Sequence, residues 1–436
     1  MELDAMKEVI KKREVKMIRA EYTDILGINR GKMIPAANIA EVVLEGLSFC
    51  SASLGMAFNN YNVPSAYFPK TYEDMRLVID KDTFELLPNN TALLLGDLYY
   101  GGKPLAQSPR GFLRRMIDEY NKLGIVPFVA SELEFSLYNK LADGKLDSYT
   151  KNPCMGYVSN ARVDEKQFFY KLTETFSKIG FNVLYMNHEY GSNQFEYNWK
   201  HSKALRAADE TALFKNLSKD IADENDMCVT FMAKPLNSSG ANGCHFHISL
   251  NGENGGNLGA DENAPSLISP LMENFIAGVL SHANGITAFL SPTINCYKRF
   301  RLDSLAPVSA TWGYDNRTAY IRVLNEHPQN TRAEVRAASA ASNPYLALGA
   351  ILAAGLDGIK NKRTPPAPAK DAYKESVCTF PRTLRDALDF LKKDEFIVSQ
   401  AGRELVDIFC GLKNEEIKDF EDYVTDWEWD TYSYHL

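Results

Sequence analysis

The sequence lacks an apolar run long enough to cross a membrane. Its longest, near Ala347–Leu356, is about half of the ~20 residues that a bilayer requires. The first twenty residues are densely charged, which excludes a secretory signal peptide. We therefore expect no membrane association and a cytoplasmic location.

Cysteines are few, odd in number and widely scattered. The chain has seven among 436 residues, and none forms a C-x-x-C pair. They stand at Cys50, Cys154, Cys228, Cys244, Cys296, Cys378 and Cys410. This distribution indicates reduced thiols and favours neither a disulfide framework nor a zinc site.

The chain also lacks a positive charge balance. Its net charge is −8 and its pI about 5.6, so binding to nucleic acid through phosphate neutralisation is not expected. Hydrophobic residues make up 45% of the chain, enough for a sizeable core, and the length predicts two or three domains.

The first hundred residues contain several short strand patterns. These are Lys16–Tyr22, Lys32–Pro35, Arg76–Asp80 and Thr91–Asp97, next to a helix at Asn38–Gly46. The Gly101–Pro104 segment (GGKP) is the best boundary, which predicts domains over residues 1–104 and 105–436. Beyond it, helices and strands alternate irregularly, as in an α+β fold.

Two segments of the second part are predicted to be helices. Pro344–Ile359 is rich in Ala, Leu and Gly, which predicts burial on most sides. Leu267–Ala283 is predicted to be one continuous helix.

Charged residues recur two apart within strand patterns, and so share a face. Glu132 and Glu134 alternate with the apolar Leu133 and Phe135. Two like charges on one face are costly unless cations compensate them. The alternative is an ordinary solvated sheet face.

Two further strands repeat this arrangement. His245 and His247 share a face, which makes them a better candidate for a metal or nucleotide site than a lone histidine, with two structural histidines as the alternative. Arg332, Glu334 and Arg336 also share one, although a surface salt-bridge ladder would show the same pattern.

A polar segment, Asn187–Glu196, supplies two more carboxylates. Glu189 and Glu196 flank Gly, Ser and Asn residues, so by itself the segment is typical of a loop. With the three strands it gives five carboxylates and one or two imidazoles. Oxygen-rich ligation with a single histidine suits Mg²⁺ or Mn²⁺ better than zinc.

Arginines accompany the acidic residues and indicate phosphoryl chemistry. They are Arg299, Arg317, Arg322, Arg332 and Arg336. The chain has no phosphate-binding P-loop, because Gly27–Lys32 (GINRGK) has the wrong spacing and Met33 follows. Any ATP must therefore be held by metals, arginines and stacking.

In this order, these residues resemble the glutamine synthetase family, type I-like, over nearly the whole chain. The motifs are SELEF (131–135), HE-x4-Q-x-E (188–196), KP-x8-CHFHISL (234–250), N-x-YKR (295–299), NRTA-x-IRV (316–323), RAEVR (332–336) and NPYL (343–346).

The resemblance implies a fold and an assembly. We expect a β-grasp N-terminal domain and a larger catalytic domain on a curved antiparallel sheet flanked by helices. Family members form stacked rings, usually two hexamers, in which a neighbour's N-terminal domain completes each site. We therefore expect a homo-oligomer, with small molecules as its other partners and neither nucleic acid nor membrane.

The resemblance also implies roles by motif position. Two or more Mg²⁺ or Mn²⁺ ions and ATP as co-substrate are expected, with glutamate activated as γ-glutamyl phosphate before an amine attacks. One metal would be held by Glu134, Glu189 and Glu196, and another by Glu132, His245 and Glu334. ATP would contact His247, Ser249 and Arg332. Glutamate and the phosphates would contact Arg299, Arg317, Arg322 and Arg336.

Two positions depart from ammonia-using members of the family. A flap glutamate is replaced by Leu305, and an ammonium-binding aspartate of the N-terminal domain by Cys50. An ammonium site needs negative charge, which neither residue supplies. Asp303 could substitute for the flap acid.

Three functions follow from this pattern. The preferred one joins glutamate to an organic amine (a polyamine, alkylamine or amino alcohol), as in the γ-glutamylpolyamine and γ-glutamylalkylamide branch. The alternatives are glutamine synthetase proper and an inactive scaffold or sensor. Retention of all six expected metal ligands argues against inactivity, because buried carboxylates without metals are costly.

Overall fold

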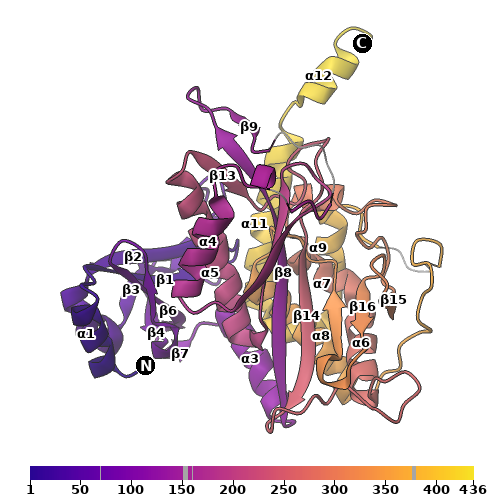
Figure 1. The fold of residues 1–436 in the computed structure, drawn as a ribbon, viewed down its shortest axis with the longest axis horizontal. Coiled ribbons are helices and arrows are strands. Elements are labelled where there is room, and N and C mark those ends of the chain that lie inside the picture. The colour runs from indigo at the N-terminus through magenta and orange to yellow at the C-terminus, as the bar shows by residue number, and fades with distance from the viewer. Residues whose placement is uncertain (69, 151–155, 160, 376–379) are drawn as a thin grey trace.

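The computed structural model describes residues 1–68, 70–150, 156–159, 161–375 and 380–436. Its strands form two sheets, and helices cover the larger one (Figure 1). The predicted α+β class is confirmed.

The first sheet is built from the N-terminal residues. Its strand order is β2-β1-β6-β4-β3, and β5 and β7 also pair with β6. β1 forms an antiparallel hairpin with β2 and runs parallel to β6. The strands are β1 Met17–Thr23, β2 Asn29–Pro35, β3 Leu47–Cys50, β4 Asp74–Ile79, β5 Glu85–Leu87, β6 Thr91–Tyr100 and β7 Lys103–Pro104. The helices beside them are α1 Leu3–Lys12 and α2 Ile39–Glu45.

The second sheet has ten strands in the order β10-β11-β8-β14-β17-β16-β15, with β9, β12 and β13 also pairing with β8. Every pairing is antiparallel except β15 with β16. The strands are β8 Ile125–Lys140, β9 Leu146–Ser148, β10 Val183–His188, β11 Gln194–Trp199, β12 Ser202–Lys203, β13 Met227–Thr230, β14 Cys244–Gly252, β15 Trp312–Tyr314, β16 Ile321–Leu324 and β17 Arg332–Val335.

The remaining helices belong mainly to the layer behind this sheet. They are α3 Pro109–Asn121, α4 Phe168–Lys178, α5 Ala204–Asp223, α6 Pro270–Ser281, α7 Ala283–Leu290, α8 Pro344–Lys360, α9 Leu384–Lys393, α10 Glu395–Ala401, α11 Arg403–Glu421 and α12 Asp426–Tyr432. No helix among the described residues is long and apolar enough to cross a membrane.

One face of the large sheet is apolar and carries the core. Leu133 and Phe135 on β8, Phe246 on β14 and Val335 on β17 are fully buried. The central helix α8 is buried along almost its whole length, as its composition predicts. A Cβ at Gly358 would lie 1.9 Å from the Asn274 carbonyl oxygen, so glycine permits the close approach of α8 to α6.

Two sequence predictions are wrong in detail. The predicted helix Leu267–Ala283 begins only at Pro270, because Leu267 has a positive φ of 56° and Ser269 caps the helix by accepting from the Met272 N–H. The predicted polar loop Asn187–Glu196 is the end of β10, a turn and the start of β11. The turn signals were real, but they span fewer residues than predicted.

A largely buried charge cluster joins the first sheet to helices α3 and α5. Arg110 on α3 donates to Asp80 (2.8 Å) and Asp97 (2.9 Å) beside the first sheet, and to Asp209 on α5 (2.8 Å). We call these four residues the Arg110 cluster. β7 still pairs with β6, so the domain boundary near residue 104 stays a prediction.

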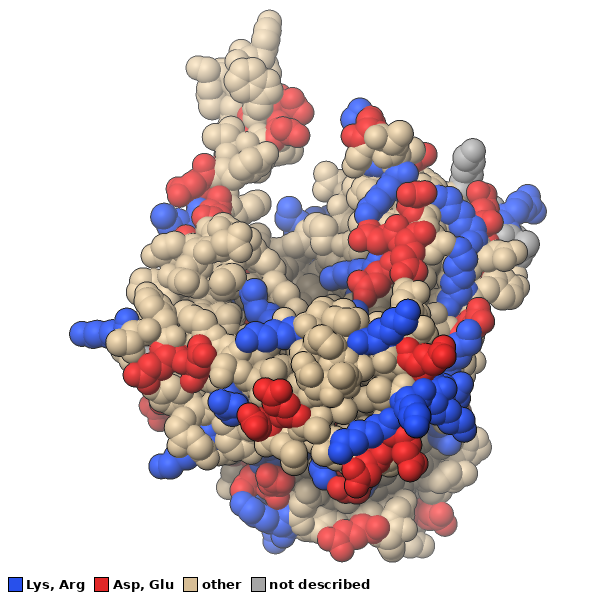
Figure 2. All heavy atoms as spheres, turned by 90° about the vertical axis from the view of Figure 1, so that its left-hand side faces the viewer, with Lys and Arg blue, Asp and Glu red and all other residues tan. Residues whose placement is uncertain are grey.

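The surface is mixed in charge and ends in a projecting tail. On the face turned towards the N-terminal residues, acidic and basic side chains are interspersed (Figure 2). The last helix, α12, extends away from the body (Figure 1), with Trp427 64% and Trp429 69% exposed. The described cysteines, Cys50, Cys228, Cys244, Cys296 and Cys410, are free thiols, and Cys154 and Cys378 lie outside the described residues.

Candidate functional site

Charged side chains form a row across the face of the large sheet opposite the core. Glu196 on β11 lies directly opposite Glu134 on β8, and Glu132 lies opposite His245 on β14. The row continues where Glu334 on β17 lies opposite His247. The period-two patterns therefore predicted the faces correctly, and the register aligns them into one site. We call this arrangement the charged row.

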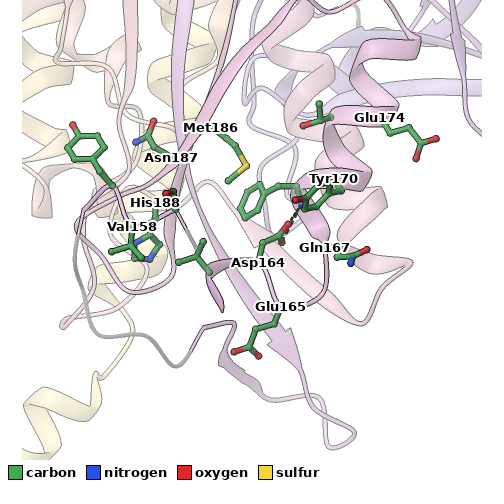
Figure 3. A pocket seen from close by; sticks show the side chains of 14 residues that line it. Val158, Asp164, Glu165, Gln167, Tyr170, Glu174, Met186, Asn187 and His188 are labelled. Atoms are coloured by element: carbon green, nitrogen blue, oxygen red, sulfur yellow. Dashed lines mark hydrogen bonds between the residues drawn. The ribbon is translucent and has the colours of Figure 1, made fainter. Parts of the chain in front are cut away.

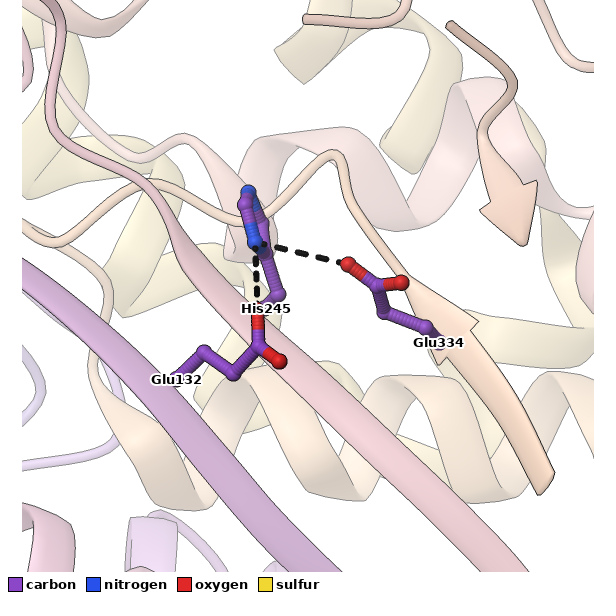
Figure 4. Close-up of side chains that lie close together, drawn as sticks. All are labelled: Glu132, His245 and Glu334. Atoms are coloured by element: carbon purple, nitrogen blue, oxygen red, sulfur yellow. Dashed lines mark hydrogen bonds and ion pairs between the residues drawn. The ribbon is translucent and has the colours of Figure 1, made fainter. Parts of the chain in front are cut away.

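The centre of the charged row is a compact set of ligand atoms (Figure 4). His245 Nδ1 lies 3.4 Å from Glu132 Oε2 and 3.5 Å from Glu334 Oε1. One ligand atom from each of the three residues lies within 4.8 Å of the others. Two carboxylates and one imidazole at this spacing fit a divalent cation that prefers oxygen, such as Mg²⁺ or Mn²⁺.

Glu334 is completely buried, which excludes the surface-ladder interpretation of its strand. Its carboxylate accepts from Arg322 at 3.0 Å and also pairs with Arg336. Burial opposes its charge, but Arg336 and the two histidines lower its pKa below the ordinary range. Three strands thus hold an ionised carboxylate beside two guanidinium groups.

Glu134 is fixed by the backbone and by an amide. Its Oε2 accepts from Gln194 Nε2 at 2.9 Å and from the Gly243 N–H at 2.8 Å. Gln194 stands in the motif of residues 188–196 but was given no role from the sequence, and the strand β11 that carries it was not predicted. The alternation of Phe195 and Tyr197 with polar neighbours was the signal that could have found this strand.

The outer end of the charged row carries too much negative charge. Burial raises the pKa of Glu189 to about 7, with a further contribution from Glu134. Burial likewise raises the pKa of Glu196 to about 9, assisted by Glu132 and Glu134. These carboxylates destabilise one another when ionised, so a bound cation would be strongly favoured here.

Of the three residues expected to contact ATP, His247 and Ser249 lie on β14 beyond His245, and Arg332 lies on β17. His247 Nε2 is 2.8 Å from Glu132 Oε1, and its Nδ1 accepts from Arg332 Nε at 3.1 Å. Ser249 is two residues further along the same strand, and so on the same face. The structure thus brings these three residues together beside the proposed metal ligands.

Arg299 is buried beneath the charged row. Its Nη2 lies 3.3 Å from His245 Nε2 and donates to the Arg336 carbonyl at 2.9 Å. Burial lowers its pKa, although Glu134 favours the charged form. Arg317 is exposed, and its carbonyl accepts from Arg336 Nε at 3.0 Å.

The two departures from the family occupy different places. The Leu305 carbonyl accepts from Arg336 Nη2 at 3.2 Å, so the flap segment borders the site, with the Leu305 side chain 41% exposed. Asp303 is also exposed, two residues away. Cys50 ends β3 in the other sheet, across the molecule from β14 and β16 (Figure 1). One chain therefore does not bring Cys50 to the charged row.

Tyr157 is a further residue that sequence reasoning missed. Its N–H donates to the His188 carbonyl at 2.8 Å. Burial raises the pKa of its phenol, and Glu189 and Arg317 are close enough to influence it. Its chain neighbours and β10 line a cavity of about 910 Å³ (Figure 3), in which Asn187 and His188 lie on one side and Glu174 on the other.

Comparisons with known proteins agree with this geometry. Residues 106–432 match the family model described as glutamine synthetase, catalytic domain. Glutamine synthetase of Pyrococcus abyssi is 33% identical over 96% of this chain and 97% of its own length. That of Thermus thermophilus is 32% identical over 98% and 97%.

Two solved structures are similar over nearly the whole chain. An ADP complex of GmaS superposes with a TM-score of 0.88 at 28% identity, over 98% of this chain and 99% of its own. A crystal structure of a novel glutamine synthase homolog gives 0.84 at 25% identity, over 95% and 96%.

Proposed function

The chain belongs to the glutamine synthetase family and is an ATP-dependent glutamate ligase, and from this premise we propose that its nitrogen donor is an organic amine rather than ammonia. The proposed product is a γ-glutamyl amide. The observation that carries the proposal is the flap segment, where Leu305 stands beside Arg336 at the site.

Divalent cations fit the residues of the charged row. Glu132, His245 and Glu334 would hold one ion, and Glu134, Glu189 and Glu196 another. The donor set is rich in carboxylate oxygens, and the raised pKa values of Glu189 and Glu196 indicate uncompensated negative charge. When bound, these ions supply charge neutralisation for phosphate oxygens.

The arginines would position the anionic substrates. Arg299 would bind the carboxylate of glutamate, and Arg336 its γ-carboxylate and the transferred phosphate. Arg317 and Arg322 would neutralise phosphates, and His247, Ser249 and Arg332 would contact ATP. Phosphorylation converts the poor leaving group of a carboxylate into a good one, and several fixed cations hold mutually repelling anions together.

The amine specificity is supported by the absence of acidic groups at two positions. Ammonium binding requires anions to attract the ion and to accept its proton, whereas leucine and cysteine leave room for an alkyl group. Each buried methylene can recover about 0.8 kcal/mol. GmaS, a γ-glutamylmethylamide synthetase, is consistent with such chemistry on this fold.

Completion of the site requires a second copy of the chain in this proposal. Cys50 lies in the N-terminal sheet, away from the charged row, so it would reach the amine pocket of a neighbouring subunit. The exposed aromatic residues of α12 also support a homo-oligomer, because such side chains are favoured at interfaces. Stacked hexameric rings are the proposed form.

An amine panel tests the proposal directly. ATP-dependent phosphate release with glutamate is measured against ammonia, methylamine, ethylamine, ethanolamine and putrescine. We expect kcat/KM for at least one amine to exceed that for ammonia by about tenfold or more, which corresponds to ~1.4 kcal/mol. A preference for ammonia over every amine would overturn it.

Glutamine synthesis from ammonia is the second candidate. The curated relatives named above are glutamine synthetases, and Asp303 lies on the same flap segment as Leu305. If neither ammonia nor any amine supports ATP-dependent phosphate release, an inactive scaffold would instead be favoured.

A further inference from the structure

A second cavity lies away from the charged row, between the N-terminal sheet and α11. Its volume is about 420 Å³, within the range of small-molecule sites. Residues from the segment after β3, from the end of β6, from the link to α3 and from the first turn of α11 line it. The lining includes Ser51, Tyr67, Phe68, Tyr100, Gln107 and Glu404.

Two polar side chains in this lining are buried without a hydrogen-bond partner among the described residues. Ser51 is 4% exposed and Gln107 is 5% exposed. The orphaned atoms are Ser51 Oγ and Gln107 Oε1. Buried polar groups are nearly always satisfied, so two orphaned atoms in residues that line one cavity point to a bound polar group.

The charge of the lining determines the sign of that group. Glu404 is half-buried, and its carboxylate forms no ion pair with any described residue, whereas no lysine, arginine or histidine belongs to the described lining. A carboxylate without a balancing cation attracts positive charge and repels anions.

The aromatic walls present rings rather than free hydroxyl donors. Tyr67 donates its phenol proton to Asp407 Oδ2 at 2.8 Å, and Tyr100 donates to Glu73 Oε2 at 2.5 Å. Both hydroxyls are therefore already engaged, and Phe68 has none. Aromatic faces stabilise a cation within about 6 Å of the ring.

We propose that this cavity binds a primary ammonium ion. Such an ion has three N–H donors, and the lining offers three acceptors in Ser51 Oγ, Gln107 Oε1 and the Glu404 carboxylate. This is a second amine site, separate from the ligation site, and it does not depend on which nitrogen donor the enzyme uses. Because Ser51 follows Cys50, occupancy would also order the segment that the proposed function places in a neighbour's amine pocket.

The test measures binding where the ligation site cannot contribute. The Glu134→Ala protein, in EDTA and without ATP, is titrated with methylammonium, propylammonium and putrescine by calorimetry, and with acetate and propanol for comparison. We expect saturable binding of the ammonium ions only. Glu404→Gln should weaken it by about tenfold, since a charge-assisted hydrogen bond is lost.

Matched variants separate a specific site from a general charge effect. Glu395→Gln removes an exposed glutamate from the first turn of α10 and should leave binding unchanged. Ser51→Ala should weaken binding several-fold. This variant replaces Glu404→Gln in the test if Glu404→Gln fails to fold. Absence of ammonium binding, equal binding of propanol, or full binding by both Glu404→Gln and Ser51→Ala would overturn the proposal. The outcome of the amine panel on the wild type does not depend on this titration, so the two proposals can fail separately.

Discussion

The charged row and the Arg110 cluster are both networks of buried charge, but they differ in balance. In the Arg110 cluster one guanidinium serves three carboxylates, and Arg114 adds a second cation to Asp80 and Asp97. Burial opposes the charge of Arg110, yet Asp209 and Asp97 raise its pKa well above the ordinary value. Each carboxylate of the cluster therefore has a cationic partner within the chain.

The charged row, by contrast, does not supply enough cationic partners for all of its carboxylates. Around Glu334 the arginines suffice, but at the other end Glu189 and Glu196 keep pKa values of about 7 and about 9 because burial and their acidic neighbours oppose ionisation. A network in which every carboxylate is paired with a cation of the chain holds two parts of the fold together, whereas one with unpaired carboxylates indicates a cation supplied from outside. This difference can be tested with variants of the charged row and with variants of the Arg110 cluster.

The largest expected effect is on activity, in the charged row. Glu134→Ala removes a carboxylate fixed by Gln194 and Gly243, so Mg²⁺- or Mn²⁺-dependent turnover should fall by more than about a thousandfold, which is ~4 kcal/mol in the barrier. The thermal midpoint should change little. Turnover is followed by phosphate release, and unimpaired activity, or wild-type activity in excess chelator, would contradict the assignment.

The Arg110 cluster should respond in stability instead. Arg110→Met leaves three carboxylates without their shared cation, and we expect a loss of about 3–5 kcal/mol in the free energy of unfolding. Denaturant titration measures it. Arg385→Gln is the control, because its pair with Glu421 is exposed and should cost less than about 1 kcal/mol. Similar losses in both variants would remove the distinction.

The imbalance of the charged row predicts a pH dependence. The folded protein holds protons on Glu189 and Glu196 up to about pH 7 and about pH 9, whereas an unfolded glutamate releases its proton near pH 4.5. Unfolding therefore releases protons, and the metal-free protein should lose stability as pH rises from about 5 to 9.

Added Mg²⁺ should reverse this loss, raising the thermal midpoint more at pH 9 than at pH 6. Thermal melts with and without Mg²⁺ at both values measure the effect. Glu196→Gln should flatten the dependence, and a metal-free wild type that grows more stable over this range would refute the interpretation.

The smallest expected effect concerns the amine. Leu305→Glu combined with Cys50→Asp adds two anions, making the site still more negative and favouring NH₄⁺. The ratio of kcat/KM for the best amine to that for ammonia should fall by about tenfold, or ~1.4 kcal/mol. Leu305→Gln with Cys50→Asn is the uncharged control. If the wild type already prefers ammonia, Asp303→Asn should abolish that preference.

Local patterns predicted much of the fold. Period-two alternation identified β8, β14 and β17 and assigned the charged and apolar faces, because neighbouring residues of a strand point to opposite sides. The Ala- and Leu-rich composition of α8 predicted its burial. β11 was not predicted, because both of its faces are buried and its polar half continues a turn-forming segment.

The sequence by itself therefore determined which side chains share a strand face, and its motifs determined the family. Only the tertiary structure decided which strands lie side by side, and so that Glu196 meets Glu134, Glu132 meets His245 and Glu334 meets Arg322. It also decided which buried charges have partners, as for Arg110, and which do not. Register and charge balance depend on contacts between residues far apart in the chain, and no local pattern records them.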